Sequence, residues 1–244
     1  MRVVGIIPAR LASARLPRKV LRPIAGEPML AHVYRATSSA NLLDEVIVAT
    51  DSQEILDFCS ARGWNARLTS PQHRSGTERV HEVALSLAAD IYLNIQGDEP
   101  LARPEHISAL LQLMKDPAVQ VGTLKTPAAA KDISNPNAVK VVTDAAGRAL
   151  YFSRATIPYD REGSRASQYF KHLGFYAYRK AALDRFCEFP ESGLERSERL
   201  EQLRFLENGI EIHVAETPYD TIGVDTEDDL RRAEQVLLAR GKTR

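Results

Sequence analysis

A basic segment follows the first strand-like run of the chain and could bind a polyphosphate. Four cations lie there with no acidic residue among them: Arg10, Arg15, Arg18 and Lys19. Arginine forms paired hydrogen bonds with phosphate oxygens and lysine acts as a point charge, so both residue types suit phosphate binding. Charge alone leaves two interpretations open, a phosphate site and a solvated basic loop.

Acidic residues in two other places could bind a metal ion. Gln96-Gly97-Asp98-Glu99-Pro100 ends a strand-like run, and its glycine and proline are typical of a sharp turn. A second acid, Asp225, directly precedes a helix cap at Thr226. Carboxylate oxygens suit Mg²⁺, and one or two of them together with substrate phosphates suffice to hold it. An acidic turn without a ligand is the commoner use of such residues.

The elements that must position these residues have the pattern of an α/β fold. Val3–Pro8, Glu45–Thr50 and Ile91–Gln96 are apolar nearly throughout, as strands buried on both faces are, and helical spacing separates them. This alternation predicts a doubly wound, mainly parallel sheet covered by helices. Ligands bind at the carboxyl ends of strands in such sheets. The basic segment and the Asp98 turn are therefore expected at the same edge, which favours a functional site there.

The pattern changes after Lys115. Strands are expected at 119–124, 138–143, 149–152 and 172–178, with a hairpin connection at 144–147. We predict an antiparallel-rich lobe, residues 119–180, inserted into a single domain that spans residues 1–244. Later elements are expected to be a helical stretch over 194–208, a strand over 210–216 and a last helix from Thr226 with Asp229 in a capping box.

Composition excludes several classes of protein. The 32 basic and 32 acidic residues balance, so no nucleic acid is expected as a partner. No apolar run approaches the roughly 20 residues of a membrane span, and no secretory leader is recognisable. Cys59 and Cys187 form neither a disulfide framework nor a zinc-ligand spacing, and both are expected to be buried in helices. These features together predict a cytoplasmic protein with no membrane partner.

Nine segments in order along nearly the whole chain resemble one known family. They are Ile6–Arg10 with Ser13, Arg15-Leu-Pro17 and Lys19, then Ala49–Asp51, Ser75–Arg79, Gln96–Pro100, Asn135–Val142, Ala149–Pro158, His172–Gly174, Leu200–Arg204 and Gly223–Thr226. The first is similar to the nucleotide-binding signature of sugar cytidylyltransferases. The whole set resembles the 3-deoxy-manno-octulosonate (Kdo) cytidylyltransferase family, which implies a nucleotide-diphospho-sugar transferase-like fold.

The resemblance also implies a reaction and its site. CMP would pass from CTP to the anomeric hydroxyl of Kdo with release of pyrophosphate, as a step of lipopolysaccharide biosynthesis. The implied cofactor is Mg²⁺ on Asp98 and Asp225, and the implied catalytic residues are Arg10, Arg15, Lys19, Asp98 and Asp225. The implied nucleotide-binding residues are Pro8, Ala9, Arg10, Arg15, Lys19, Thr50, Asp51, Arg74, Ser75, Gly76 and Asp98. The implied sugar-binding residues are Gln96, Arg154, His172, Glu201 and Gln202.

Some points depart from the family pattern or stay open. Arg18 stands where the family usually has glycine or a small residue, and Ala14 stands where serine or threonine is usual. For Thr50-Asp51-Ser52, capping of a helix is an alternative to nucleotide binding. The family suggests a homodimer whose contact includes Val139, Val141, Leu173 and Phe175, unless they are buried in the monomer core. A related acidic sugar (8-amino-Kdo or a sialic acid), another nucleotide, and a non-catalytic nucleotide-binding protein are the alternative functions.

Overall fold

The computed structural model describes residues 1–13, 15–163 and 168–241, so Ala14 lies outside the described residues. These residues divide into two compact units. Unit 1 consists of Met1–Ser108 together with the chain from Thr221 onward, and unit 2 is Ala109–Asp220. The lobe expected at residues 119–180 lies within unit 2.

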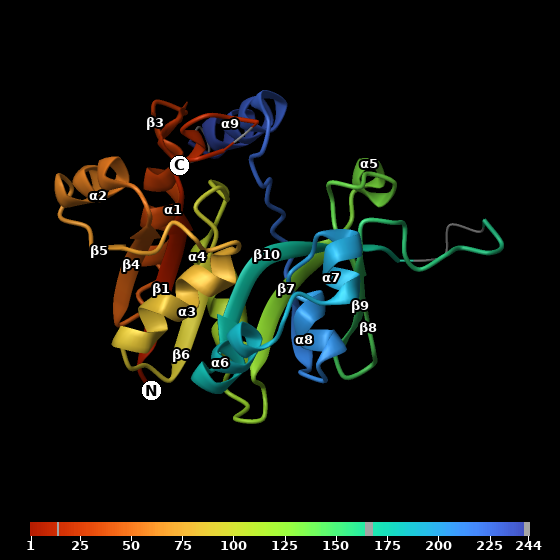
Figure 1. Ribbon diagram of the computed structural model, residues 1–244. Coiled ribbons are helices and arrows are strands. Elements are labelled where there is room, and N and C mark those ends of the chain that lie inside the picture. Colours follow the sequence, from red (N-terminus) through yellow and green to blue (C-terminus); the bar gives the residue numbers. More distant parts are fainter. Residues whose placement is uncertain (14, 164–167, 242–244) are drawn as a thin grey trace. The chain divides into compact units, whose positions relative to one another are not determined.

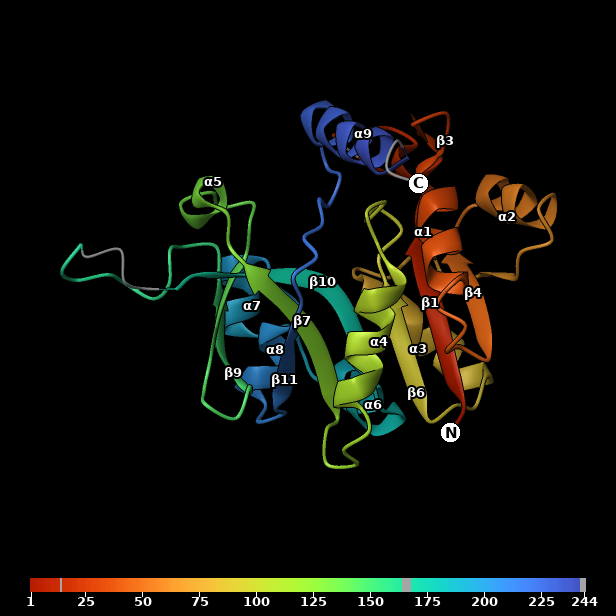
Figure 2. The ribbon, with the colours of Figure 1, turned by 180° about the vertical axis from the view of Figure 1, so that it is seen from behind.

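Unit 1 contains a parallel sheet with the order β6 (Ile91–Ile95), β1 (Val3–Ala9), β4 (Glu45–Thr50) and β5 (Ala66–Leu68) (Figure 1). Every residue of β1 is buried. The reason is that α3 (Gly76–Ser86) covers one face of this sheet and α1 (Met29–Ser38) covers the other (Figures 1 and 2). The predicted parallel strands are confirmed, and their carboxyl ends lie at one edge.

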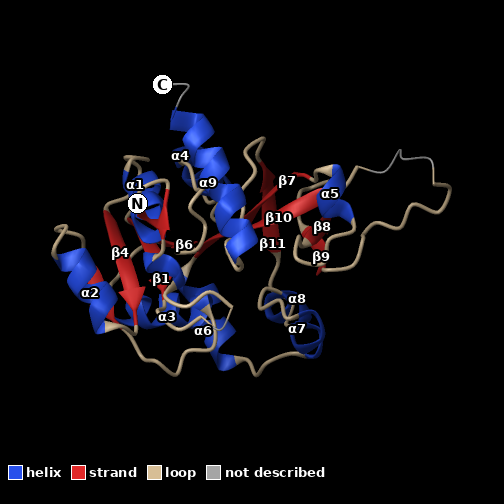
Figure 3. Ribbon diagram, turned by 90° about the horizontal axis from the view of Figure 1, so that it is seen from above, coloured by secondary structure: helices blue, strands red, loops and turns tan. Residues whose placement is uncertain are grey.

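The remaining elements of unit 1 support that edge. They are η1 (Lys19–Leu21), the hairpin of β2 (Pro23–Ile24) and β3 (Glu27–Pro28), α2 (Gln53–Ser60), which lies beside β4 in Figure 3, and α9 (Glu227–Gly241). The predicted capping box is present, because Thr226 Oγ1 accepts from the Asp229 N–H at 3.2 Å and Asp229 Oδ2 accepts from the Thr226 N–H at 3.1 Å.

An apolar cluster joins the basic segment to the last helix. Leu16 and Met29 pack with Val224 and Leu230, and all four side chains are buried. The packing holds the chain on either side of Lys19 against the residues that flank Asp225. Burial of apolar surface therefore fixes the place of two polar site candidates that are far apart in the sequence.

Unit 2 is built on β7 (Val121–Pro127), which pairs antiparallel with β10 (Phe170–Tyr178) and parallel with β11 (Ile212–Glu216) (Figure 2). The expected hairpin is confirmed: β8 (Lys140–Thr143) and β9 (Ala149–Ser153) pair antiparallel. Gly147 adopts φ 78° in the connection, a left-handed conformation that favours glycine.

The helices of unit 2 correct one expectation. They are α5 (Ala130–Ile133), α6 (Lys180–Glu188), α7 (Gly193–Glu198) and α8 (Leu203–Glu207). The residues of α4 (Pro104–Leu113) are divided between the two units at Ser108. A continuous helix over 194–208 is wrong, because Arg199 adopts φ 55° and ends α7.

Burial corrects two further expectations. Cys59 is buried, but Cys187 is only partly buried. Three of the four residues suggested for a dimer contact, Val141, Leu173 and Phe175, are at most 1% exposed, so they belong to the core of unit 2. Their aliphatic and aromatic side chains fill the space between packed elements and are not available to a partner.

Candidate active site

Lys19 joins the two acidic residues proposed for the sheet edge. Its Nζ lies 2.6 Å from Asp98 Oδ2 and 2.9 Å from Asp225 Oδ1, and only 12% of its side chain is exposed. Burial lowers the pKa of the Lys19 ammonium, but the charges and hydrogen bonds of Asp98 and Asp225 outweigh burial and raise that pKa above its ordinary value. Lys19 therefore stays positively charged between the two carboxylates.

Asp225 is held from two further directions. Arg15 Nη2 donates to Asp225 Oδ2 at 2.8 Å, and the Val224 N–H donates to the Asp98 carbonyl oxygen at 2.9 Å. Burial raises the pKa of the Asp225 carboxyl, but Lys19 and Arg15 outweigh burial, and the pKa lies below its ordinary value. Asp225 is therefore an ionised carboxylate fastened beside the Asp98 turn.

The turn that carries Asp98 is pressed against the end of β1. The Gly97 N–H donates to the Pro8 carbonyl oxygen at 3.2 Å, and a Cβ at position 97 would lie 2.8 Å from that oxygen. A side chain there would force the two strand ends apart. Gly97 therefore permits the close approach that brings Asp98 to the basic segment.

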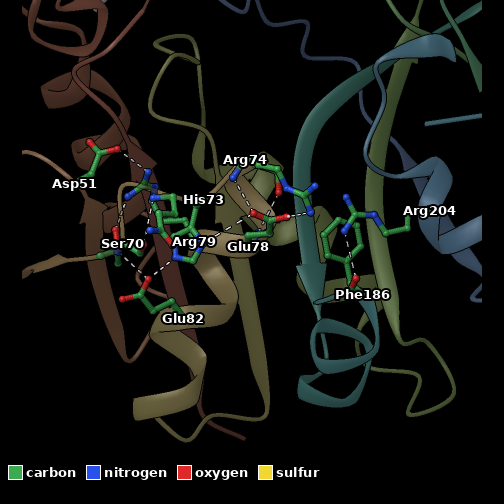
Figure 4. Close-up of polar contacts among 12 residues, drawn as sticks. Asp51, Ser70, His73, Arg74, Glu78, Arg79, Glu82, Phe186 and Arg204 are labelled. Atoms are coloured by element: carbon green, nitrogen blue, oxygen red, sulfur yellow. Dashed lines mark hydrogen bonds and ion pairs between the residues drawn. The ribbon is translucent and has the colours of Figure 1, made fainter. Parts of the chain in front are cut away.

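The start of α3 forms a third side of the site. Ser75 is its N-cap and accepts from the Glu78 N–H at 3.2 Å, while Glu78 Oε2 accepts from the Arg74 N–H at 2.7 Å (Figure 4). The first turn is thereby ordered, and the positive end of the helix dipole there favours anions. A Cβ at Gly76 would lie 2.9 Å from Gln96 Nε2, so the helix start also packs closely on Gln96.

These segments of unit 1 enclose a cavity of about 100 Å³. It brings together nine of the residues implied by the family resemblance: Pro8, Ala9, Arg10, Lys19, Arg74, Ser75, Gly76, Gln96 and Asp98. Arg10 is exposed, and within the described chain its guanidinium makes no ion pair. The cavity therefore presents cations and a helix N-terminus beside a carboxylate, which suits a polyphosphate and a cation.

Thr50 and Asp51 do not line this cavity. Thr50 is fully buried, and Asp51 Oδ2 accepts from Arg79 Nη2 at 2.8 Å (Figure 4). Arg79 is 3% exposed and also donates to Thr69 Oγ1, so it ties the ends of β4 and β5 to α3.

Three residues that line the cavity were not predicted from the sequence: Val20, His73 and Arg79. Arg79 lay within the Ser75–Arg79 motif, where an arginine in a helix gave no sign of burial.

Four sugar-binding candidates lie in unit 2. Arg154 follows β9, and its guanidinium donates to the carbonyl oxygens of Glu198 at 2.7 Å and Pro136 at 3.0 Å. These bonds hold the side chain between the end of α7 and the loop after α5. Glu201, partly buried, and Gln202, 4% exposed, lie in the turn between α7 and α8 that the Arg199 conformation creates.

His172 lies on β10 with its ring between Phe152 and Tyr176. The ring centroids are 5.0 Å and 5.5 Å apart, and Nε2 lies 3.0 Å from Thr123 Oγ1. Although part of the residue is accessible, this packing desolvates the imidazole and lowers the pKa of His172 to about 3. His172 is therefore neutral at ordinary pH and offers hydrogen bonds without charge.

Comparison with known proteins decides the family. A sequence model of the cytidylyltransferase family matches residues 4–212. The 3-deoxy-manno-octulosonate cytidylyltransferase of Koribacter versatilis is 69% identical over 240 residues, which cover 98% of this chain and 92% of that protein. The chain belongs to the 3-deoxy-manno-octulosonate cytidylyltransferase family. The family member from Acidobacterium capsulatum is 61% identical and matches 99% of both chains.

A solved structure supports the same family and the fold. The structure of CMP:2-keto-3-deoxy-manno-octonic acid synthetase complexed with CTP has a TM-score of 0.93 and 42% identity, and it covers 98% of this chain and 100% of that one. The predicted α/β fold of the nucleotide-diphospho-sugar transferase type is thereby confirmed. Within the part of the chain that the structure describes, no helix has the length and apolarity needed to cross a membrane.

Proposed function

We propose that this chain transfers CMP from CTP to the anomeric hydroxyl of Kdo, which gives CMP-Kdo and pyrophosphate and activates Kdo for lipopolysaccharide biosynthesis. Full-length identity with named members of the family and a close structural neighbour complexed with CTP support this reaction. Within the chain itself, the observation that supports this reaction is one cavity. It is lined by Arg10, Lys19, the start of α3 and Asp98.

The triphosphate of CTP binds to the basic segment. Arg10, which is exposed, and Lys19, which is charged, offer hydrogen bonds to phosphate oxygens, and the N–H groups at Ser75 and Gly76 add a helix N-terminus. Arg15 adds a further positive charge for the phosphates, and its hydrogen bond orients Asp225. Positioning and electrostatics carry this kind of transfer, so no covalent nucleophile is required.

Asp98 and Asp225 are the proposed holders of Mg²⁺. Both carboxylates reach the same ammonium nitrogen, at 2.6 Å and 2.9 Å, so their oxygens lie close enough to serve one cation. Two carboxylates with phosphate oxygens are the hard donor set that Mg²⁺ takes. When bound there, Mg²⁺ would neutralise phosphate charge and make the sugar hydroxyl more acidic. The positive charge of Lys19 offsets the repulsion between the two carboxylates and so allows them to lie close together.

The proposed sugar-binding residues supply complementary chemistry. Arg154 offers a permanent cation for the Kdo carboxylate. Neutral His172 and the polar side chains of Gln96, Glu201 and Gln202 offer hydrogen bonds to hydroxyl groups. His172 cannot act as a general acid near neutral pH, because its imidazole carries no excess proton there.

Measurement of pyrophosphate release tests this function. CTP, UTP, ATP and GTP are each combined with Kdo, 8-amino-Kdo and N-acetylneuraminate in the presence of Mg²⁺. Release only with CTP and Kdo is the expected result. Release with CTP and another acidic sugar would overturn the sugar assignment and leave the nucleotide assignment intact. If the folded protein releases no pyrophosphate with any of these pairs, the proposed enzymatic function is excluded.

A cytoplasmic location and a homodimer complete the proposed function. Within the described residues neither Cys59 nor Cys187 forms a disulfide bond, which fits a reducing compartment. Within the described sheet of unit 2, β9 pairs only with β8, and Leu150 on it is 61% exposed. An exposed strand edge with an apolar side chain suits pairing with a second copy. Light scattering on the purified protein measures the mass, and a monomer at micromolar concentration would contradict the dimer.

A further inference from the structure

Asn94 is a polar residue at the centre of an otherwise apolar strand. It lies on β6 between Leu93 and Ile95, and none of its surface is exposed. In the described chain its side chain takes part in one hydrogen bond, in which Gln96 Nε2 donates to Asn94 Oδ1 at 3.1 Å. Asn94 Nδ2 has no partner there. Because a buried unpaired N–H group is unfavourable, this asparagine makes β6 less stable than an apolar residue would.

Gln96 is also held from its other side. Gln96 directly follows β6, two positions after Asn94, and the hydrogen bond between the two side chains shows that they share a face of the sheet. On that face the start of α3 packs on the Gln96 amide so closely that a Cβ at Gly76 would lie 2.9 Å from Nε2 and 3.2 Å from Oε1. The amide group of Gln96 is therefore fixed between the Asn94 side chain and the backbone of α3, at the wall of the cavity.

We propose that Asn94 is a positioning residue that holds Gln96 with its amide oxygen as the hydrogen-bond acceptor for a sugar hydroxyl. This role rests on the proposed function, because it takes Gln96 as a sugar-binding residue. A free glutamine side chain samples several rotamers and two amide orientations, and ordering it opposes binding. The bond to Asn94 commits Nε2 as a donor before the sugar arrives, which leaves Oε1 as the acceptor. Asn94 itself contacts no substrate in this arrangement.

Stability and sugar affinity should respond in opposite directions. Asn94→Leu removes both the acceptor and the unpaired N–H group. We expect KM for Kdo to rise about fivefold, the factor that one neutral hydrogen bond is worth. KM for CTP should stay within twofold, and the unfolding temperature should be unchanged or higher. A lower unfolding temperature with both KM values unchanged would show that Asn94 is merely structural and would overturn the positioning role.

Asn94→Asp is the matched control variant. It keeps an oxygen facing Gln96 and exchanges only the Nδ2 amino group for a hydroxyl oxygen, because burial favours the protonated, uncharged acid. KM for Kdo should stay within twofold of the native value. A rise equal to that of Asn94→Leu would contradict the role of the acceptor oxygen. Gly76→Ala disturbs the same amide from α3, so it tests the position of Gln96 even if Asn94→Leu does not fold.

A double-mutant cycle separates this inference from the proposed function. Gln96→Ala should raise KM for Kdo, and Asn94→Leu added to Gln96→Ala should raise it no further, because the residue on which Asn94 acts is gone. Additive effects would overturn the positioning role and leave Gln96 as a sugar-binding residue. If native protein uses CTP but not Kdo, the proposed sugar is overturned instead. The double-mutant cycle is then measured with the sugar that the protein does use, and it tests the role of Asn94 independently.

Discussion

Lys19 Nζ donates to Asp98 Oδ2 over 2.6 Å, although 79 positions separate the two residues in the sequence. The same nitrogen reaches Asp225, so one ammonium balances two carboxylates at the carboxyl edge of the parallel sheet. A divalent cation bound to those carboxylates would share their oxygens with Lys19. The charge of Lys19 therefore affects both the stability of the site and its affinity for Mg²⁺.

Lys19→Met should make the fold depend on Mg²⁺. Without the ammonium, the Asp98 and Asp225 carboxylates repel one another in a partly buried site. We expect a lower unfolding temperature in EDTA, recovery on addition of Mg²⁺, and a fall in kcat/KM for CTP of at least tenfold. Differential scanning fluorimetry measures the first two quantities. Lys131→Met, on the exposed surface of α5, is the control. Equal stabilisation of variant and native protein by Mg²⁺ would contradict a shared site.

Asp98→Asn and Asp225→Asn should each lower kcat at least a hundredfold, because an amide is a much poorer ligand for Mg²⁺ than a carboxylate. Circular dichroism should show that both variants stay folded. Asp228→Asn, at a side chain of α9 that is 70% exposed, provides the control and should keep native activity. Near-native turnover in either of the first two variants, measured as pyrophosphate release, would remove that residue from the metal site.

The predictable part of the fold is that in which local pattern and burial agree. β1, β4 and β6 are apolar because both faces are covered, and Thr226 and Asp229 cap α9 as their spacing indicates. The end of α7 was not predictable. Arg199 gives no local signal for a left-handed conformation, and the apolar spacing of 194–208 continues through the break because Leu200, which follows Arg199, and Leu203, which begins α8, are both buried.

The site was predictable where strand ends determine it. The strand-end rule places Asp98 near the basic segment, whereas Asp225 converges on Lys19 through packing of α9 that no local pattern encodes. Asp51 shows the opposite limit. It follows a strand at the same edge, but the buried Arg79 guanidinium binds its carboxylate. Burial of an arginine depends on long-range contacts, so the sequence could not distinguish a ligand-binding Asp51 from a paired one.

His172 should make stability depend on pH below neutrality. Its pKa is lowered to about 3 in the folded chain and is about 6.5 in the unfolded chain. As pH falls from about 6.5 to 3, His172 binds a proton in the unfolded chain but not in the folded chain. The contribution of neutral His172 to the free energy of unfolding is therefore fully present above pH 6.5 and is lost progressively below it. The free energy of unfolding in urea, measured at several pH values, should fall less steeply for His172→Gln than for native protein. His213→Gln is the control variant. If the free energy of unfolding has the same pH dependence in His172→Gln as in native protein, the lowered pKa of His172 is contradicted.

Arg18→Gly should leave both activity and stability nearly unchanged. Arg18 adopts φ 56°, a left-handed conformation that costs about 1–2 kcal/mol for a residue with a Cβ, and its exposed guanidinium pairs with Glu54 and does not line the cavity. Glycine relieves that strain but increases the entropy of the unfolded chain by about 0.5–1 kcal/mol. The free energy of unfolding should therefore stay level or rise by about 1 kcal/mol, whereas Arg18→Val, which is β-branched, should lower it by about 1–2 kcal/mol. Urea unfolding measures both changes, and a large loss of CTP turnover in Arg18→Gly would instead place the Arg18 guanidinium on the phosphates.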